Sequence, residues 1–351
     1  MSAGWLFFAT TVAVYVLTAM IACWGLNLQF GETGILNFSF IVFEAIGAYT
    51  CGVLTLGPSS GNGGFQHYIF GASLPFPIPW LAAMVVGALF SLIIGVLVLR
   101  RLRGDYQAMV MLVISLVGTY IVSADKGLFN GSNGLALVPA PFSSVLGSPG
   151  TSETYRLFYT GLSLVVCVGI WLVVRRLTNS PYGRVLRAIR ENDEAAAALG
   201  KNVMAYRLSV FMIGGALGAL AGAMLVQLIG AWSPGSWLYP ETFTLFAAVI
   251  IGGRGNTWGV AAGAALVPGL FLEGVLFLPS FGPAYLVGAL QWIVIGVAII
   301  AFMWFRPQGV IPERRHTFGR SGASLARLRP PTPVDASRQP VPIGNPAVGA
   351  E

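Results

Sequence analysis

Residues 180–200 read SPYGRVLRAIRENDEAAAALG and form the one strongly charged, helix-forming segment of a chain that is otherwise almost entirely apolar. Ser180 is a preferred cap for the amino end of a helix, Pro181 suits the first helical position, and Gly200 favours a stop at the carboxyl end. These signals predict a single polar helix of about 19 residues. Such a helix between apolar segments is either a contact surface for a partner protein or a solvated loop helix without a partner.

The composition indicates a membrane protein. The chain has 351 residues, of which 56% are hydrophobic and 9% are charged, whereas about a quarter of the residues of a soluble domain are charged. The net charge of +7 does not indicate nucleic-acid binding, because the basic residues lie at the ends of apolar runs, as they do in cytoplasmic loops of membrane proteins. We therefore expect a multi-pass membrane protein that contacts lipid and no nucleic acid.

Apolar runs predict nine spans, since a helix that crosses a bilayer needs about 20 apolar residues, or fewer where it is broken. The predicted spans are residues 5–26, 34–56, 80–99, 106–122, 159–174, 208–230, 240–253, 256–278 and 285–305. The sequence thus predicts an all-α polytopic membrane protein with about eight to ten transmembrane helices, some of them broken, in a domain of residues 1–305. Residues 306–351 are rich in Pro and poor in large apolar side chains, which predicts a disordered cytoplasmic tail.

The basic residues also predict the orientation of the chain. Of the 20 Lys and Arg residues, all except Lys126 and Arg156 fall in segments that we assign to the cytoplasmic side. Residues 175–207 are therefore predicted to lie inside the cell and residues 124–158 outside it. With nine spans the amino terminus is outside, unless an extra half-helix around residues 27–38 reverses the orientation.

A second unusual stretch, GLNLQFGETGILNFSFIVFEAIGAY, covers residues 25–49 and places polar side chains in apolar surroundings. Polar groups at membrane depth are costly unless they face protein or a water-filled path. The stretch therefore predicts a discontinuous helix that lines a pathway through the membrane. The predicted pathway residues are Asn27, Glu32, Asn37 and Glu44. The alternative is that these side chains only hold neighbouring helices together by hydrogen bonds.

No pattern of residues predicts a catalytic site, a metal site or a bound cofactor. Cys23, Cys51 and Cys167 lie in apolar runs, and the two His residues are far apart in the sequence. The Gly-rich stretch around Arg254 lacks the GK[ST] ending of a phosphate loop, so the chain is not expected to hydrolyse ATP. Arg254 is predicted either to cap a helix end or to anchor the chain at the cytoplasmic side. Glu273 is either a packing residue or a pathway residue.

Several motifs, taken together and in order, resemble those of one protein family. They are GLNLQFGETGILNFSF with EAIGAYT, RLRGDYQAMV, NGSNGL, PYGRVLRAIRENDEAAAALG, IIGGRGNTWGVAAGA and FRPQGVIPER. Over residues 25–314 they are similar to the landmarks of bacterial high-affinity branched-chain amino acid ABC transporter permeases. The RPQG and GDY motifs resemble the M-type subunit of that family, whereas LNFSF resembles its H-type partner.

The resemblance implies a function, partners and a site. It implies an importer permease of the bacterial cytoplasmic (inner) membrane that moves a small-molecule cargo by alternating access. The implied partners are a second, homologous permease subunit, two cytoplasmic ATP-binding subunits and an extracytoplasmic substrate-binding protein. In the EAA-x-x-x-G pattern of ABC importer permeases, the residues implied to contact the ATPase are Glu194, Ala195, Ala196 and Gly200. The implied cargo is a branched-chain amino acid, with urea or a short-chain amide as the alternative.

Two other classes of function are alternatives. A secondary transporter driven by protons or sodium would use Glu32, Glu44 and Glu273 as coupling carboxylates, because ionisable groups in spans often mark ion relays. That interpretation leaves the charged segment at residues 180–200 unexplained. A membrane enzyme is the weaker alternative, since no His, Cys or paired acidic cluster indicates a catalytic site.

Overall fold

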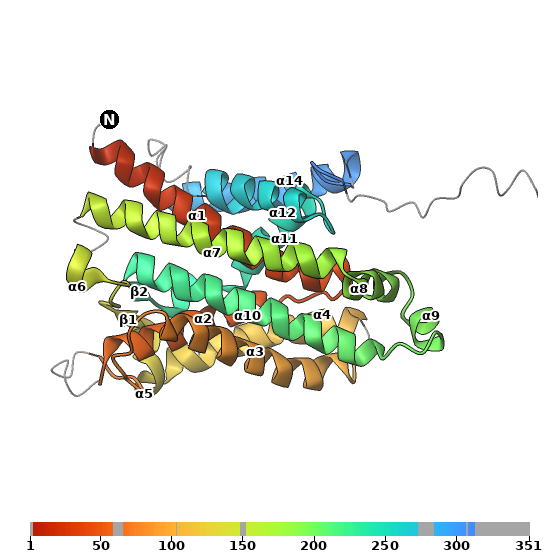
Figure 1. Ribbon diagram of the computed structural model, residues 1–351, viewed down its shortest axis with the longest axis horizontal. Helices are drawn as coiled ribbons and strands as arrows, with labels where there is room; N and C mark the ends of the chain where they lie inside the picture. The colour runs from red at the N-terminus through yellow and green to blue at the C-terminus, as the bar shows by residue number, and fades with distance from the viewer. Residues whose placement is uncertain are drawn as a thin grey trace, which may run out of the picture. The chain divides into compact units, whose positions relative to one another are not determined.

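The chain folds as an all-α protein, as predicted. The computed structural model describes residues 3–58, 66–102, 104–147, 152–272, 284–306 and 308–312. These residues are mostly helical and include two short antiparallel strands, β1 (Leu135–Ala136) and β2 (Ala231–Trp232). The long helices run side by side, with short elements and loops at their two ends (Figure 1). Glu273 and the tail beyond Pro312 fall outside the described residues, so their predicted roles stay predictions.

Each of the nine predicted spans contains a helix. Five helices of the described residues are long and apolar enough to cross a bilayer. They are α1 (Ala3–Asn27), which continues into the π-helical turn η1 (Leu28–Glu32), α3 (Ile78–Leu99), α4 (Gly104–Ala124), α7 (Glu153–Asn179) and α10 (Val203–Ile229). The other predicted spans contain α2 (Phe40–Leu56), α11 (Tyr239–Gly252), α12 (Thr257–Ala264) with its π-helical continuation η5 (Ala265–Leu272), and α14 (Ala284–Phe305).

The chain is broken between α1 and α2. The predicted span at residues 34–56 becomes helical only at Phe40, because residues 33–39 form no helix. Gly34 has a φ of 78°, in the left-handed region, which a continuing right-handed helix does not accommodate. The start of that span was therefore wrong by several residues, whereas the predicted discontinuity is present.

Short elements connect the spans. At one end of the helices lie α5 (Lys126–Phe129), the 3-10 turn η3 (Gly131–Asn133), α6 (Ser143–Leu146) and a second 3-10 turn, η4 (Pro234–Ser236), together with the strands. At the other end lie α8 (Pro181–Glu191) and α9 (Asp193–Ala198) (Figure 1).

Helix α10 is the most buried of the long spans and packs against α1, α2 and α3. Its small residues let neighbouring backbones approach closely, as is usual where membrane helices associate. A Cβ atom added to Gly222 of α10 would overlap the backbone carbonyl of Glu44 in α2, and one added to Gly47 of α2 would overlap the carbonyl of Ala219. This contact fixes the position of α2 against the centre of the protein.

The outer face of α3 is suited to lipid. Every fourth residue of this helix is a large, exposed apolar side chain: Leu81, Val85, Leu89, Ile93 and Leu97. Its opposite side is buried and carries small residues, among them Gly87 and Ser91, which pack against α10. A helix that is apolar on its exposed side as well as on its buried side is stable in hydrocarbon rather than in water.

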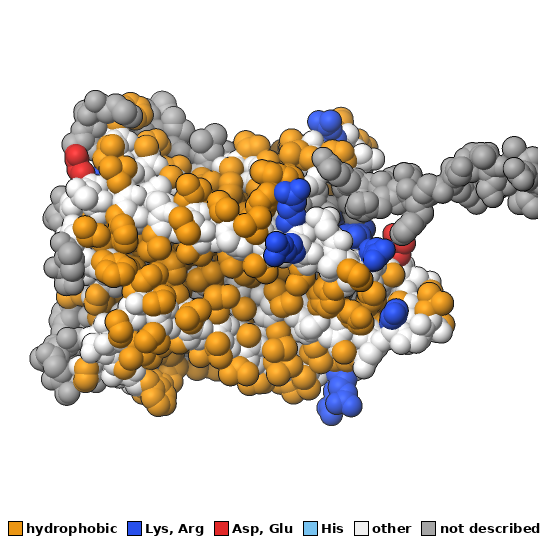
Figure 2. Space-filling model, viewed as in Figure 1, with side chains coloured by type: hydrophobic (Ala, Val, Ile, Leu, Met, Phe, Trp, Pro, Cys, Tyr) orange, Lys and Arg blue, Asp and Glu red, His pale blue; other side chains and the backbone are white. Residues whose placement is uncertain are grey.

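Basic side chains gather at one end of the helices, which we call the basic end. Figure 2 shows almost all the visible Lys and Arg side chains toward the end that carries α8 and α9. The basic end comprises Arg100, Arg101, Arg175, Arg176, Arg184, Arg187, Arg190, Lys201, Arg207, Arg254 and Arg306. Helix α1 starts at the opposite end, where the Arg156 guanidinium lies 4.8 Å from the centre of the Phe7 ring. If the basic end is cytoplasmic, the amino terminus is outside, in agreement with the sequence-based prediction.

Labelling of single cysteines tests this orientation. We expect Thr154→Cys, exposed at the start of α7, to react with a membrane-impermeant thiol reagent in intact spheroplasts. Lys201→Cys, exposed at the basic end, should react only after the membrane is opened. The native thiols of Cys23, Cys51 and Cys167 are buried and should add little background. The opposite labelling pattern would show that the orientation is inverted.

Candidate functional site

The predicted docking helix consists of two short helices, which we call the docking segment (residues 181–200). α8 and α9 meet at Asn192, whose backbone leaves the helical region at φ −158° and ψ 107°. The Asn192 side chain accepts a hydrogen bond of 2.9 Å from the Ala195 N–H and so caps α9. The prediction of one continuous helix is wrong because an Asn side chain that binds a backbone N–H starts a new helix.

The two ends of the docking segment differ in how well they were predicted. Pro181 is in the first turn of α8, as predicted. Ser180 is the N-cap residue of α8, as predicted, but its hydroxyl donates to the Leu177 carbonyl at 2.7 Å and makes no capping bond to α8. Gly200 has a φ of 77°, and the Lys201 N–H after it bonds to the carbonyl five residues back at 3.2 Å. Gly200 therefore ends the segment in a left-handed turn, as predicted.

The surface of the docking segment is largely exposed. Glu194, Ala195 and Gly200 are exposed, whereas Ala196 is buried against the rest of the protein. Leu199, which the sequence analysis did not single out, is 81% exposed. Three of the four predicted ATPase contacts are thus accessible, as is this apolar side chain, whereas Ala196 is covered.

Two side-chain bonds tie the docking segment to α10. Arg207 of α10 forms an ion pair with Asp193 at 3.0 Å. The hydroxyls of Tyr182 and Ser209 lie 2.5 Å apart, and since Ser209 donates to the Tyr206 carbonyl, Tyr182 is the donor in this pair. Burial raises the pKa of the Tyr182 phenol, which keeps this donor protonated.

Two arginines of α8 also hold the turn η1, in a contact that we call the α8–η1 clamp (Arg187, Arg190, Gly31 and Glu32). Arg187 Nη1 lies 3.1 Å from Glu32 Oε2 and also donates to the Thr178 carbonyl at 3.2 Å. Arg190 donates to the Gly31 carbonyl. Glu32 is only 1% exposed, and a carboxylate so deeply buried is tolerated when it is paired. The predicted pathway residue Glu32 is thus placed as a link between the docking segment and the break after α1.

Asn37 lies in a buried hydrogen-bond network. Its Nδ2 donates to Gln29 Oε1 at 2.8 Å, and Gln29 Nε2 donates to the Phe211 carbonyl of α10 at 3.0 Å. Asn37 Oδ1 accepts a bond of 2.7 Å from the Ser39 hydroxyl. These bonds satisfy the polar groups within the protein and join η1 to α10, an arrangement that favours the packing alternative for Asn37.

Asn27 connects the end of α1 to the turn between α11 and α12. Its Oδ1 accepts a bond of 2.9 Å from the Gly255 N–H. The chain that follows α14 meets the same turn, because the Val310 N–H bonds to the Ile251 carbonyl at 2.8 Å. The IIGGRGN and RPQG motifs, far apart in the sequence, therefore lie together. Arg254 is exposed in this turn, which favours its role as an anchor over its role as a helix cap.

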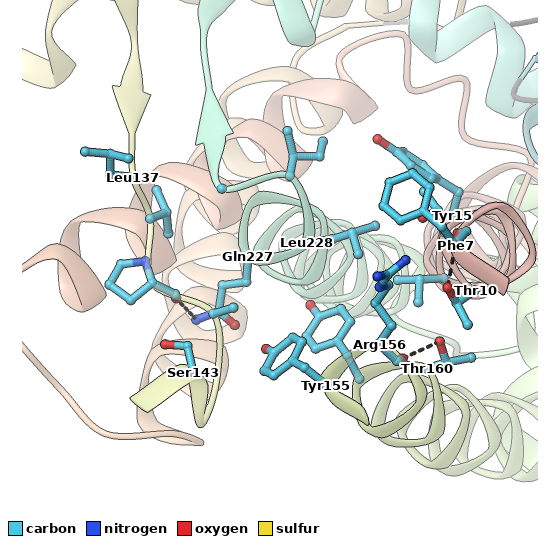
Figure 3. A pocket seen from close by; sticks show the side chains of 18 residues that line it. Phe7, Thr10, Tyr15, Leu137, Ser143, Tyr155, Arg156, Thr160, Gln227 and Leu228 are labelled. Atoms are coloured by element: carbon cyan, nitrogen blue, oxygen red, sulfur yellow. Dashed lines mark hydrogen bonds between the residues drawn. The ribbon is translucent and has the colours of Figure 1, made fainter. Parts of the chain in front are cut away.

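An outer cavity of about 610 Å³ lies between the first half of α1, the start of α7 and the end of α10. Figure 3 shows Phe7 and Tyr15 of α1 on one side of it, and Gln227 and Leu228 of α10 on the other. Arg156 is the one charged side chain among the described residues that line this cavity. Its guanidinium lies against the Phe7 ring, a cation–π contact that leaves a fixed positive charge at the cavity wall.

An inner cavity of about 250 Å³ adjoins the outer one and is bordered by α1, α2, α10, α11 and η5. Tyr15 and Ile229 line both cavities. Glu44 of α2 and Glu241 in the first turn of α11 line the inner one. Glu44 is thus the predicted pathway residue that borders an open space, and Glu241 is a second acid that the sequence analysis did not single out.

Comparison with known proteins places the chain in a family. The model of the family described as "Branched-chain amino acid transport system / permease component" matches residues 5–303. The chain belongs to this family. It is 28% identical to the probable branched-chain amino acid transport permease protein LivM of Methanocaldococcus jannaschii, over 82% of this chain and 89% of that protein. It is 27% identical to the high-affinity branched-chain amino acid transport system permease protein LivM of Escherichia coli, over 90% of this chain and 71% of that protein.

Relatives named for other cargoes also match. The fructose import permease protein FrcC of Rhizobium meliloti is 30% identical to this permease over 66% of this chain and 65% of that protein. No solved structure matches the chain.

Family membership confirms the predicted class: the permease is a multi-pass protein of the cytoplasmic membrane and a translocation subunit of an ABC importer. The M-type name LivM of the two relatives agrees with the prediction from the RPQG and GDY motifs.

Proposed function

We propose that this permease carries branched-chain amino acids into the cell. The observation that carries the proposal is the family match over residues 5–303, and the LivM relatives that cover most of the chain support it. The proposed partners are a second, homologous permease subunit, two cytoplasmic ATP-binding subunits and an extracytoplasmic substrate-binding protein that delivers the cargo. In this proposal ATP is hydrolysed on the ATP-binding subunits.

The proposed coupling route starts at the docking segment, where Glu194, Ala195 and Gly200 contact the ATPase and Ala196 supports them. The α8–η1 clamp then passes a movement of α8 to the end of α1. Because η1 is bonded to α10 and leads into α2, this movement reaches the walls of the inner cavity. Alternating access results when the cavity opens toward one side of the membrane at a time.

In the same proposal the four predicted pathway residues have two roles. Asn27, Glu32 and Asn37 shape the pathway indirectly, since they hold the break between α1 and α2 in place through bonds to other elements. Glu44 acts directly, because it borders the inner cavity.

Uptake of labelled leucine by cells that make the complete importer tests the proposed cargo. We expect ATP-dependent uptake to disappear when this subunit alone is deleted and to return when it is supplied again. Urea, a short-chain amide and fructose are measured in parallel. Loss of urea or amide uptake with unchanged leucine uptake would contradict the proposed cargo. Uptake that survives ATP depletion but stops when ion gradients collapse would indicate an ion-coupled transporter.

Changes in the docking segment should separate the permease from its ATPase. A valine at Gly200 disfavours the left-handed turn by about 1 to 2 kcal/mol, which corresponds to about 5- to 30-fold weaker ATPase binding if the full cost falls on the docked state. Glu194→Lys reverses a charge on the docking segment. It should also weaken ATPase binding if the new positive charge meets a basic residue of the ATPase. Both variants should reach the membrane, and co-purification of the ATP-binding subunits is the measurement.

Gly161→Val is the matched control for Gly200→Val, because Gly161 lies within helix α7 and has open space for a side chain. It should co-purify with the ATP-binding subunits like the natural permease. Full ATPase binding and full transport by a Gly200 or Glu194 variant would exclude that residue from the docking contact.

A further inference from the structure

Glu44 and Glu241 are two acids that line one cavity. No described Lys or Arg forms an ion pair with either carboxylate, and no basic residue is among the described residues that line the inner cavity. The side chains come from different helices, α2 and α11, and line the same cavity. Glu44 is 7% exposed, and a carboxylate buried at membrane depth is costly unless something compensates its charge.

Two further polar atoms of residues that line the same cavity lack a partner within the described residues. They are the Thr244 hydroxyl oxygen and the Trp232 indole nitrogen, both of which are buried. Both residues line the inner cavity, whose volume of about 250 Å³ equals that of roughly eight water molecules. Cavities that stay empty are apolar, whereas this one gathers four polar groups in need of partners.

The positions of the two acids are fixed by the fold. The backbone of α2 at Glu44 touches Gly222 of α10, so Glu44 has no room to withdraw toward α10. Glu241 directly follows Pro240 in the first turn of α11, where the proline restricts the backbone. Groups held on rigid helices are suited to bind a ligand without further rearrangement.

We propose that the inner cavity binds the ammonium group of the cargo between Glu44 and Glu241. This inference rests on the proposed function and names the part of the cargo that the permease itself recognises. An ammonium group has three N–H donors, which the two carboxylates and the Thr244 hydroxyl can accept, and its charge offsets that of the acids. The Trp232 N–H is the donor available to the cargo carboxylate. Aliphatic side chains on the same walls, such as Leu225, suit a hydrocarbon chain.

Arg156 in the outer cavity acts at an earlier stage than the two acids. Along α1, Phe7 borders the outer cavity beside Arg156, and Thr18 borders the inner one. Tyr15, which lies between these two positions on α1, lines both cavities, so the two cavities adjoin. In this proposal the cargo carboxylate meets Arg156 first, and the ammonium group reaches the acids after the cargo moves inward.

Protection of a single cysteine tests the ammonium site in the complete importer. Ser236→Cys places a thiol on the exposed rim of the inner cavity, where the rate of its reaction with an impermeant thiol reagent is measured. The probes are leucine, 3-methylbutylamine, which has the ammonium group but no carboxylate, 4-methylpentanoate, which has the carboxylate but no ammonium group, and sodium chloride. We expect leucine and the amine to slow the reaction and the other two probes to leave it unchanged.

The acids are tested in the same Ser236→Cys background. Glu44→Gln and Glu241→Gln should each raise the concentration of amine needed for half-protection by about tenfold or more. The matched control is Glu153→Gln, the same change at an exposed acid at the start of α7. In this variant the concentration of amine needed for half-protection should equal that of the parent. Co-purification of the ATP-binding subunits verifies that each variant is assembled, and Glu241→Gln tests the site if Glu44→Gln does not assemble.

The outcomes separate this inference from the proposed cargo. Equal protection by 4-methylpentanoate or by sodium chloride, or unchanged protection in both acid variants, overturns the ammonium site. Leucine uptake by the natural importer combined with unchanged protection in the acid variants refutes the site and leaves the cargo standing. Protection by the amine that depends on both acids, in an importer that takes up no leucine, supports the site and refutes the cargo.

Discussion

Gly47→Val should prevent the permease from accumulating in the membrane. A side chain at Gly47 would overlap the backbone carbonyl of Ala219, and a backbone atom in the centre of the protein cannot move aside as a flexible side chain can. Overpacking in a core costs about 1 to 3 kcal/mol and occasionally more, and we expect the upper part of that range. Helix α2 would be pushed away from α10, and Glu44, one turn before Gly47, would move with it. Immunoblots of membranes and thermal denaturation in detergent measure the effect.

Gly169→Val is the control for this prediction. Gly169 lies in α7, and nothing is near the place where its side chain would be. This variant should accumulate and denature like the natural permease. If Gly47→Val behaves in the same way, the close contact between α2 and α10 does not limit stability.

The spans were predictable because hydrocarbon imposes a simple rule on composition. Helix α3 is apolar on both sides, so its run of apolar residues gives its bounds to within two residues. Glycines were not predictable in the same way. Gly34 takes a left-handed turn that breaks the chain, whereas Gly47 lies inside a helix where another backbone touches it. Sequence alone does not distinguish these two uses, because backbone conformation and helix partner both depend on the folded protein.

The candidate site was predictable as a set of polar residues and not as a set of contacts. Glu32 and Glu44 are both acids in apolar surroundings, which is why the sequence grouped them. The structure separates them, because Glu32 pairs with Arg187, 155 residues away, whereas Glu44 faces a cavity together with Glu241. Pairing across such a distance follows from the packing of helices. The break at Asn192 had a local signal, since Asn followed by acidic residues is typical of a new helix start.

Loss of the basic residue Arg187 from the α8–η1 clamp should destabilise the folded permease more than loss of the acid Glu32. Arg187→Gln removes the ion pair that Arg187 makes with the buried Glu32 carboxylate, and breaking such a buried pair from one side costs up to about 3 to 5 kcal/mol. Glu32→Gln leaves Arg187 charged, but this side chain is 21% exposed and keeps its bond to the Thr178 carbonyl, so the cost is smaller. The double variant, in which neither charge remains, should therefore be more stable than Arg187→Gln alone. Arg176→Gln, at an exposed position in the last turn of α7 and outside the docking segment, is the control and should leave the stability unchanged.

The same variants should show whether the clamp couples ATP hydrolysis to transport. Glu32→Gln does not change the exposed surface of the docking segment, so we expect normal co-purification and hydrolysis by the ATP-binding subunits. Glu32→Gln removes the ion pair that passes a movement of α8 to η1, whereas the bond from Arg190 to the Gly31 carbonyl is kept. Leucine transported per ATP hydrolysed should therefore fall in Glu32→Gln and remain normal in Arg176→Gln. Equal ratios in the two variants would show that the ion pair stabilises the fold without transmitting movement. The coupling route would then have to run through the bonds from Asp193 of α9 and Tyr182 of α8 to Arg207 and Ser209 of α10.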